Sequence, residues 1–294
     1  MATVDIAASG SGLTGFQQTV HLPWEENRLS IDYALPKAEI WGFHRGAYTP
    51  VETETLTARV VRIPPGQASP AHRLTRDVAF VQLAGELIIS AGRQRFLAGP
   101  NDLYTIPGGI PRKLFNPGIT DAFFLSIQSK SEVDDGGMEL LEVGPEAWDA
   151  PAGLEIFHLA WKDYRRRVVW RGGLSERQGY KRGVFPFLET EDMRGHAVRV
   201  PAGQGSPWHT FPGVAIFVGM VGEIEVYADN KAYSLGPMDL LMLPGPNYAL
   251  QNIGLDDAVY FSLGPTGIPR EQMIYYEPAV PGNPLAGPGV EVAP

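Results

Sequence analysis

The chain has 294 residues, about twice the length of a common domain, so length alone allows one large domain or two ordinary ones. It is 44% hydrophobic and 19% charged, which excludes wholesale disorder and a coiled coil. The net charge is −9 and there is no basic run, so we expect neither nucleic acid nor a membrane as a partner. A small molecule or a protein is the expected partner.

The chain contains no cysteine, which excludes disulfides, thiolate metal sites and a cysteine nucleophile. The first residues, MATVDIAASGSGLTG, lack the basic flank and apolar segment of a signal peptide, and no stretch approaches the ~20 apolar residues of a membrane helix. We therefore expect a soluble, cytoplasmic protein.

The most informative feature is an internal repeat at a nearly constant offset. HLPWE at 21–25 returns as HLAWK at 158–162, and VRIPPGQASPAH, ending at His72, returns as VRVPAGQGSPWH, ending at His209. The offset shortens by one residue before Asn116 and its counterpart Asn252. The repeat predicts an N-terminal extension (1–20), a first barrel (21–128), a linker (129–157), a second barrel (158–265) and a Pro/Gly-rich C-terminal arm (266–294).

Short β-rich runs alternate with Gly and Pro along both copies, and none has a convincing helical period. This spacing predicts an all-β fold with two small barrels. MELLEV in the linker is expected to form a short helix, and the tail an extended arm or a disordered end. The main runs are LTARVVRI (56–63), VAFVQLAGELIIS (78–90) and AFFLSI (122–127), then HAVRV (196–200), AIFVGMVGEIEVY (215–227) and AVYFSL (258–263).

The arrangement of these residues resembles the cupin superfamily, specifically two-domain cupins (bicupins), in which each domain is a jelly-roll barrel. The first family motif orders Gly, His, His, Glu and Gly at fixed spacing. In the first copy the two glycines and the first His are present as Gly66, Gly85 and His72. Leu74 and Val78 replace the second His and the Glu. The second copy keeps the same frame, with Gly203, His209, Phe211, Ala215 and Gly222 in these places.

The second family motif supplies a further His ligand between a Pro and a closing Asn. In the first copy Arg112 stands at that ligand position, before Asn116. In the second copy the missing residue leaves two options, Tyr248 when counted back from Asn252 and Ala249 when counted forward from Pro244. We prefer Tyr248, because the strand that follows has the more constrained register.

In cupins that carry a metal, three imidazoles and a carboxylate hold the ion. Each copy here keeps one His and replaces the other ligands, and apolar or guanidinium side chains donate no lone pair to a cation. We therefore predict no metal and no other cofactor in either barrel. The alternative is a metal-dependent cupin oxygenase with unorthodox ligands, drawn from His44, His158 or His196.

The motif frame also predicts which side chains point into the barrels. We expect His209, Tyr248 and His72 as catalytic residues, because an imidazole and a phenol can exchange protons near neutral pH. Arg112 would bind an anion, reach solvent or pair with Asp77. The predicted substrate-binding residues are Arg112, Gln82, Phe80, Phe211 and Phe217, with Leu74, Val78 and Ala215 beside them. The repeated pairs His21/His158 and Arg62/Arg199 are expected to serve packing.

These residues favour a metal-independent enzyme that acts on a small anionic or aromatic metabolite, including carboxylates, by general acid–base catalysis. Isomerisation, elimination and ring-opening hydrolysis are all open. A non-catalytic small-molecule-binding bicupin is the main alternative, and the sequence is also compatible with a homodimer. It does not indicate which barrel is active.

Overall fold

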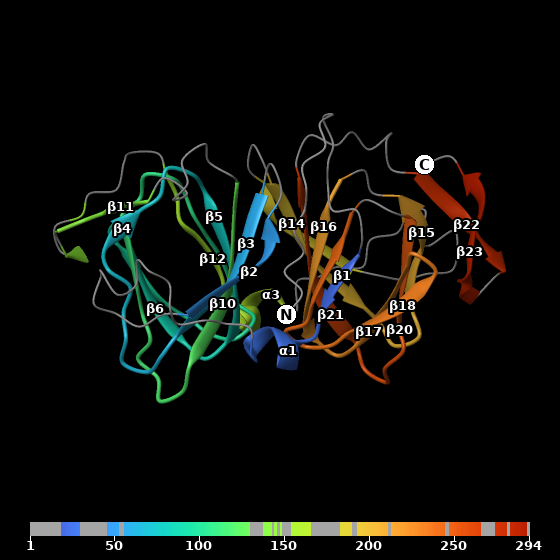
Figure 1. The fold of residues 1–294 in the computed structure, drawn as a ribbon, viewed down its shortest axis with the longest axis horizontal. Coiled ribbons are helices and arrows are strands. Elements are labelled where there is room, and N and C mark those ends of the chain that lie inside the picture. Colours follow the sequence, from blue (N-terminus) through green and yellow to red (C-terminus); the bar gives the residue numbers. More distant parts are fainter. Residues whose placement is uncertain are drawn as a thin grey trace. The chain divides into compact units, whose positions relative to one another are not determined.

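The computed structural model describes residues 19–29, 46–52, 56–129, 138–142, 144–145, 148, 154–165, 183–189, 193–210, 213–244, 247–265, 274–280 and 283–292. The chain divides into two compact units. Residues 25–167 form the first-barrel unit, and residues 1–24 together with 168–294 form the second-barrel unit. Strands make up nearly all of both units, as the sequence predicts (Figure 1).

The first-barrel unit consists of two antiparallel sheets that enclose one apolar core. The six-stranded sheet has the order β12-β8-β5-β10-β3-β2, and the five-stranded sheet has the order β11-β4-β9-β6-β7. The bounds are β2 Gly46–Glu52, β3 Leu56–Ile63, β4 His72–Arg73, β5 Val78–Ala84, β6 Leu87–Ala91, β7 Gln94–Ala98, β8 Leu103–Ile106, β9 Arg112–Phe115, β10 Ala122–Ser129, β11 Glu139–Leu140 and β12 Phe157–Leu159, with helix α3 at Trp161–Tyr164.

The second-barrel unit repeats this plan with one additional strand at the edge of its second sheet. Its sheets have the orders β1-β19-β16-β21-β14-β13 and β18-β17-β20-β15-β22-β23. The bounds are β1 Val20–Leu22, β13 Gly183–Glu189, β14 Met193–Val200, β15 Gly205–Thr210, β16 Ala215–Val221, β17 Ile224–Ala228, β18 Lys231–Leu235, β19 Leu240–Leu243, β20 Asn247–Asn252, β21 Ala258–Pro265, β22 Ile274–Val280 and β23 Asn283–Val292. Helix α1, Trp24–Leu29, begins at the last residue of the 1–24 segment, and its other residues belong to the first-barrel unit.

Buried and exposed side chains alternate along the strands, so that one face of each sheet lines the barrel interior and the other faces outwards. In β6, for example, Leu87, Ile89 and Ala91 are fully buried, while Ile88 and Ser90 between them are partly exposed. This period of two is expected for a strand with one face on the core. Each unit has its own buried cluster inside the barrel.

Residues of the family frame hold the same turns in both units. Asn116 donates from Nδ2 to the Ile63 and Thr120 carbonyls, both at 2.8 Å, and Asn252 repeats the arrangement with the Val200 and Asp256 carbonyls. Gly85 has φ +67°, and a Cβ there would lie 2.6 Å from the Asp121 carbonyl oxygen. Only glycine fits that turn without strain.

The HLPWE and HLAWK segments each pair with a strand of the other copy of the repeat. β1, which precedes the first barrel, pairs with β19, and in Figure 1 this blue strand lies among orange strands. β12, which precedes the second barrel, pairs with β8. The compact units therefore differ from the expected domain boundaries, because 21–24 joins the second-barrel unit and 158–165 the first.

An aspartate fixes each of these segments. Asp102 accepts from the Trp161 backbone N–H at 2.7 Å and lies 3.1 Å from His158 Nε2, while Asp239 accepts from the Trp24 backbone N–H at 2.6 Å. Arg62 and Arg199 form ion pairs with Asp121 and Asp257. The expectation that these repeated residues serve packing agrees with these contacts.

Two local expectations need comment. The predicted MELLEV helix is wrong over its described residues, since β11 pairs there with β4. The tail forms an antiparallel hairpin of β22 and β23, with β22 also pairing with β15.

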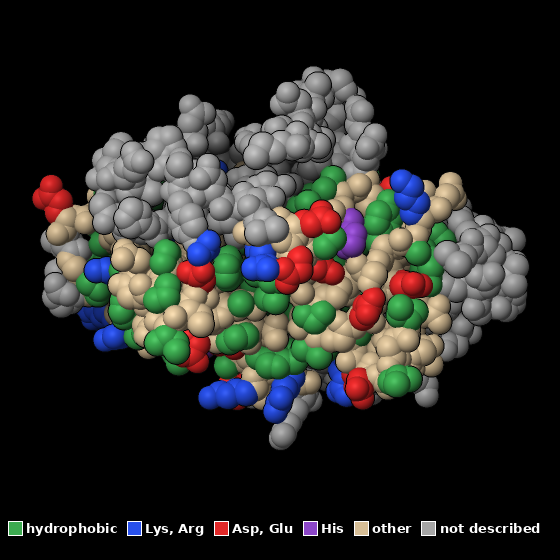
Figure 2. Space-filling model, turned by 60° about the horizontal axis from the view of Figure 1, so that its bottom comes forward, with side chains coloured by type: hydrophobic (Ala, Val, Ile, Leu, Met, Phe, Trp, Pro, Cys, Tyr) green, Lys and Arg blue, Asp and Glu red, His purple; other side chains and the backbone are tan. Residues whose placement is uncertain are grey.

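No helix among the described residues is long and apolar enough to cross a membrane. On the face drawn in Figure 2, acidic and basic side chains are interspersed.

Candidate functional site in the first barrel

Each barrel buries one histidine in the same geometry. His72 Nδ1 lies 2.9 Å from the Pro70 carbonyl oxygen, and His209 Nδ1 lies 2.9 Å from the Pro207 carbonyl oxygen. A carbonyl can only accept, so Nδ1 carries the hydrogen and Nε2 is the lone-pair nitrogen of the neutral ring. Both histidines are thus prepared to accept a proton at Nε2.

The strand opposite each histidine decides between Tyr248 and Ala249 as the counterpart of Arg112. In the first barrel His72 on β4 pairs with Arg112 on β9, and in the second His209 on β15 pairs with Tyr248 on β20. The His209 and Tyr248 rings lie inside the barrel with centroids 4.2 Å apart. Ala249 lies on the opposite face of its strand, in a separate cluster. Tyr248 therefore occupies the former ligand position.

Aromatic side chains pack the described interior of the second barrel. The Phe217 ring contacts Tyr248 and Tyr260 in edge-to-face geometry, at centroid distances of 5.4 and 5.3 Å. Ala215 belongs to the same core cluster. Phe211, a predicted substrate-binding residue, lies outside the described residues. Packing accounts for Phe217 and Ala215 without a ligand.

The first barrel instead contains a cavity of about 70 Å³ beside His72. A volume of that size holds about five water-sized groups, since one occupies roughly 15 Å³. Apolar side chains form most of its wall, with a few polar groups among them. The lining residues are Arg59, Val61, Ile63, Ser69, His72, Leu74, Phe80, Leu114, Phe124, Ser126, Gln128 and Met138.

The sequence predicts His72, Leu74 and Phe80 in this wall. Val78 and Gln82 are fully buried but do not line the cavity. Gln82 donates from Nε2 to the Ala84 carbonyl at 3.0 Å and to the Gly85 carbonyl at 3.3 Å. Its amide supports the turn after β5.

Arg112 lies opposite His72, as the motif frame predicts, but it does not reach the cavity. Its side chain is fully buried and does not line the cavity, which excludes the alternative in which it reaches solvent. Nη2 donates to the Pro107 carbonyl at 3.1 Å, and Nη1 has no hydrogen-bond partner among the described residues. Burial lowers the pKa of Arg112, and the charge of Asp77 raises it in part. No ion pair joins the two within the part of the chain that the structure describes.

Sequence reasoning missed the polar residues on β3 and β10. Arg59 faces Ser126 directly across the β3–β10 pair, and Ser126 in turn faces Phe80 on β5. The period-two pattern of the strands could have identified these residues. Arg59 lies on the same strand face as Val61 and Ile63, and Gln128 on the same face as Ser126. Met138, from the segment before β11, carried no such pattern.

Arg59 is the most informative of these residues. It is partly buried, and among the described residues its guanidinium has neither a hydrogen bond nor an ion pair. Two other arginines of this unit form ion pairs, Arg62 with Asp121 at 2.6 Å and Arg73 with Glu139 at 2.7 Å. A partly desolvated cation without an anion is costly, so the cavity is suited to an anionic ligand.

Comparison with known protein families gives a match within the first barrel. Residues 59–128 match the cupin domain family, and these residues include nearly the whole cavity wall. The first barrel is a cupin domain. A search of curated protein sequences gave no match to the chain.

Solved structures extend the cupin fold over both barrels. Salicylate 1,2-dioxygenase from Pseudoaminobacter salicylatoxidans, as its gentisate adduct, is 14% identical with TM-score 0.65, covering 85% of this chain and 86% of that one. A putative glyoxylate-induced protein from Pseudomonas aeruginosa is 15% identical with TM-score 0.62, covering 90% and 93% of the two chains. At these identities the likeness establishes the fold alone.

The cupin ligand positions in this chain do not fit a metal ion. Leu74 and Val78 offer no donor atom, and the guanidinium of Arg112 repels a cation. Among the described residues no three His, Asp or Glu side chains converge. His158, one of the alternative ligands, stacks on Phe96 at a centroid distance of 4.3 Å and contacts Asp102. His196 lies on β14, and His44 lies outside the described residues.

Proposed function

We propose that this chain is a metal-independent cupin enzyme that binds a small carboxylate in the first barrel and transforms it by general acid–base catalysis. One observation supports this most directly: the cavity is lined both by an imidazole, His72, and by a guanidinium, Arg59, that has no partner among the described residues.

Arg59 is the proposed carboxylate anchor. A guanidinium presents several N–H donors in one plane and so matches the two oxygens of a carboxylate. Ser126, directly across from Arg59, and Gln128, two residues on and in phase with it, add neutral hydrogen-bonding groups. The anchor is therefore assigned to Arg59 in place of Arg112.

His72 is the proposed acid–base residue. Its Nδ1–H is oriented by the Pro70 carbonyl, so that Nε2 is the nitrogen that would take a proton from a carbon atom of the bound acid. The same nitrogen then returns the proton to a neighbouring atom, in an isomerisation, or to a leaving group, in an elimination. Neither reaction changes the oxidation state of the enzyme, and neither requires a cofactor.

The cavity volume limits the substrate. At about 70 Å³ it suits a carboxylate of a few carbon atoms rather than a drug-sized ligand, whose sites span roughly 300–1,000 Å³. The gentisate named for the dioxygenase is itself an aromatic carboxylate, which supports the ligand class. We infer a shorter acid here.

A second candidate uses His209 and Tyr248 in the second barrel. Their rings contact each other at a centroid distance of 4.2 Å, and an imidazole beside a phenol can transfer protons. The aromatic packing around Tyr248 argues for a core role. The two candidates differ in which histidine is needed for turnover.

The test starts with a panel of short 2-oxo, 2-hydroxy and unsaturated carboxylates. We expect at least one to raise the melting temperature of the wild-type protein but not of Arg59→Ala. In D₂O that acid should acquire deuterium in the presence of wild-type protein, and His72→Gln should bind it without exchange. Binding without exchange by the wild type would favour the non-catalytic alternative.

Elemental analysis tests the absence of a metal. We expect well under one equivalent of iron, manganese, nickel or zinc per chain, with deuterium exchange unchanged after chelation. About one equivalent that is lost in His72→Ala or His209→Ala would overturn metal independence.

A further inference from the structure

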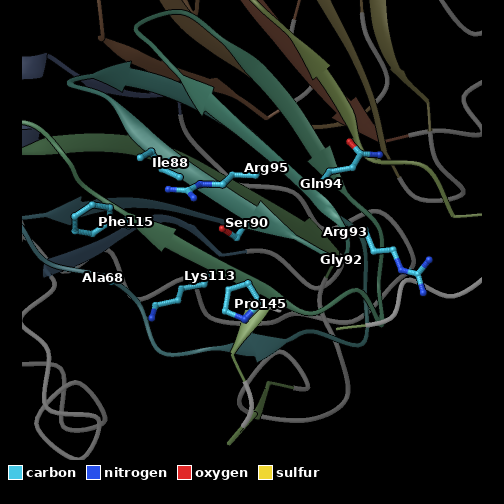
Figure 3. A pocket seen from close by; sticks show the side chains of 10 residues that line it. All are labelled: Ala68, Ile88, Ser90, Gly92, Arg93, Gln94, Arg95, Lys113, Phe115 and Pro145. Carbon is cyan, nitrogen blue, oxygen red and sulfur yellow. The ribbon is translucent and has the colours of Figure 1, made fainter. Parts of the chain in front are cut away.

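A second hollow lies on the outer face of the five-stranded sheet in the first-barrel unit. Its volume is about 630 Å³. It is formed by β6, β7 and β9 on the side opposite the barrel interior, because its residues alternate with buried ones such as Ile89 and Leu114. The lining residues are Ala68, Ile88, Ser90, Gly92, Arg93, Gln94, Arg95, Lys113, Phe115 and Pro145 (Figure 3).

Strand register arranges the cations of this hollow in a row. Ser90 on β6 pairs with Arg95 on β7 and with Lys113 on β9. Figure 3 shows Ser90 between the two cations. Facing side chains on neighbouring strands have Cβ atoms roughly 5 Å apart, so both long cationic side chains can reach a group bound above the Ser90 hydroxyl.

The next row along the same face is apolar. Ile88 pairs with Leu97 on β7 and with Phe115 on β9. Leu97 is 50% exposed, although a large apolar side chain on a strand favours burial. The face therefore places a cationic row directly beside an apolar row.

No counter-ion for the two cations of the row is found in the part of the chain that the structure describes. Neither Arg95 nor Lys113 forms an ion pair or a side-chain hydrogen bond among the described residues, whereas exposed Arg73 of the same unit pairs with Glu139 at 2.7 Å. In a chain of net charge −9, two unpaired neighbouring cations create a local site for an anion.

The second barrel shows that the fold does not require this row. At the equivalent positions Tyr227 pairs with Ala232 and Ala249. Tyr227 and Ala249 are buried in one cluster with Trp208. The duplicated sheet is thus stable with a neutral row at these three positions. The cations are particular to the first barrel, so packing alone does not explain them.

We propose that this face binds an amphipathic organic anion. Its anionic group would lie over Ser90, between Arg95 and Lys113, and its apolar body over Ile88 and Phe115. The volume falls within the roughly 300–1,000 Å³ of small-molecule sites. This site is independent of the barrel cavity, because the two lie on opposite faces of the sheet.

The probe for this proposal is 8-anilinonaphthalene-1-sulfonate, which joins a sulfonate to aromatic rings and fluoresces when bound in an apolar site. We expect saturable binding to the full chain that weakens as salt is added. The double variant Arg95→Ala/Lys113→Ala should weaken it at least tenfold, and Leu97→Ser about threefold. Lys231→Ala, on the equivalent hairpin of the second barrel, is the matched control and should bind as the wild type does.

Competition distinguishes an amphipathic ligand from a simple anion. Phenyl phosphate should displace the probe at concentrations at least tenfold lower than inorganic phosphate. Equal competition by the two would overturn the role of the apolar row. Unchanged probe affinity in Arg95→Ala/Lys113→Ala, or no binding to the wild type, would overturn the site itself.

Discussion

The two barrels share one framework but differ in their interiors. Both keep the closing asparagine, the turn glycines and the histidine held by a proline carbonyl. At the inward positions, Arg59 of the first barrel corresponds to His196 of the second, and Phe124 to Tyr260. The first interior contains a cavity with a cation that has no partner among the described residues, and the described interior of the second is packed by aromatic rings. The framework residues set the fold, and a few inward side chains set the site.

The largest expected effect concerns the packed barrel. Tyr248→Ala removes a buried ring that contacts His209 and Phe217, so we expect a loss of about 3–5 kcal/mol in the free energy of unfolding. Tyr248→Phe keeps the ring and should cost under about 1 kcal/mol. Urea denaturation measures both. Loss of turnover in Tyr248→Phe with stability intact would instead make the second barrel catalytic.

The two histidines provide the next test. His72→Ala should lower kcat at least about a hundredfold, the usual size of an acid–base contribution. His209→Ala should leave kcat within about twofold, because that ring belongs to the packed interior. Steady-state kinetics with the carboxylate found above measures both, and the reverse pattern would exchange the roles of the barrels.

Asparagine substitutions test what the barrels share. Asn116→Ala and Asn252→Ala each remove three hydrogen bonds and leave buried backbone groups unpaired. We expect each to cost about 2–3 kcal/mol. Calorimetry of both variants checks that the losses agree within about 1 kcal/mol, and a large inequality would show that one barrel depends on the turn more than the other.

Arg112→Met has the smallest expected effect. The substitution removes a buried cation whose Nη1 lacks a partner among the described residues, and replaces it with an apolar chain. We expect stability to change by less than about 1 kcal/mol. Carboxylate affinity should stay within twofold by calorimetric titration, whereas Arg59→Ala should weaken it at least tenfold. A large affinity loss in Arg112→Met would restore Arg112 as the anchor.

The sequence predicted the duplication, the all-β fold and the meeting of His209 with Tyr248, because repeats and period-two alternation are local patterns. It placed Arg112 opposite His72 and inside the barrel, which the register and burial confirm, but it did not predict that this side chain stays outside the cavity wall, since the motif frame gives a Cα position and not the direction of a long side chain. Arg59 was missed because it lies on β3, and the motif frame begins only at Gly66, after that strand. The pairing of β1 and β12 could not be assigned, because HLPWE and HLAWK are alike and so are the edges of β19 and β8 that receive them.

The placement of β1 has a consequence for how the protein is made. Val20 pairs with Met242 and His158 with Tyr104, so a segment near the start of the chain waits for a strand that the ribosome produces much later. Pairings across such sequence distances slow folding. During synthesis the first barrel can complete its sheet once β12 emerges, while β1 remains an unpaired strand. The pairing of β1 with β19 is therefore among the last to form.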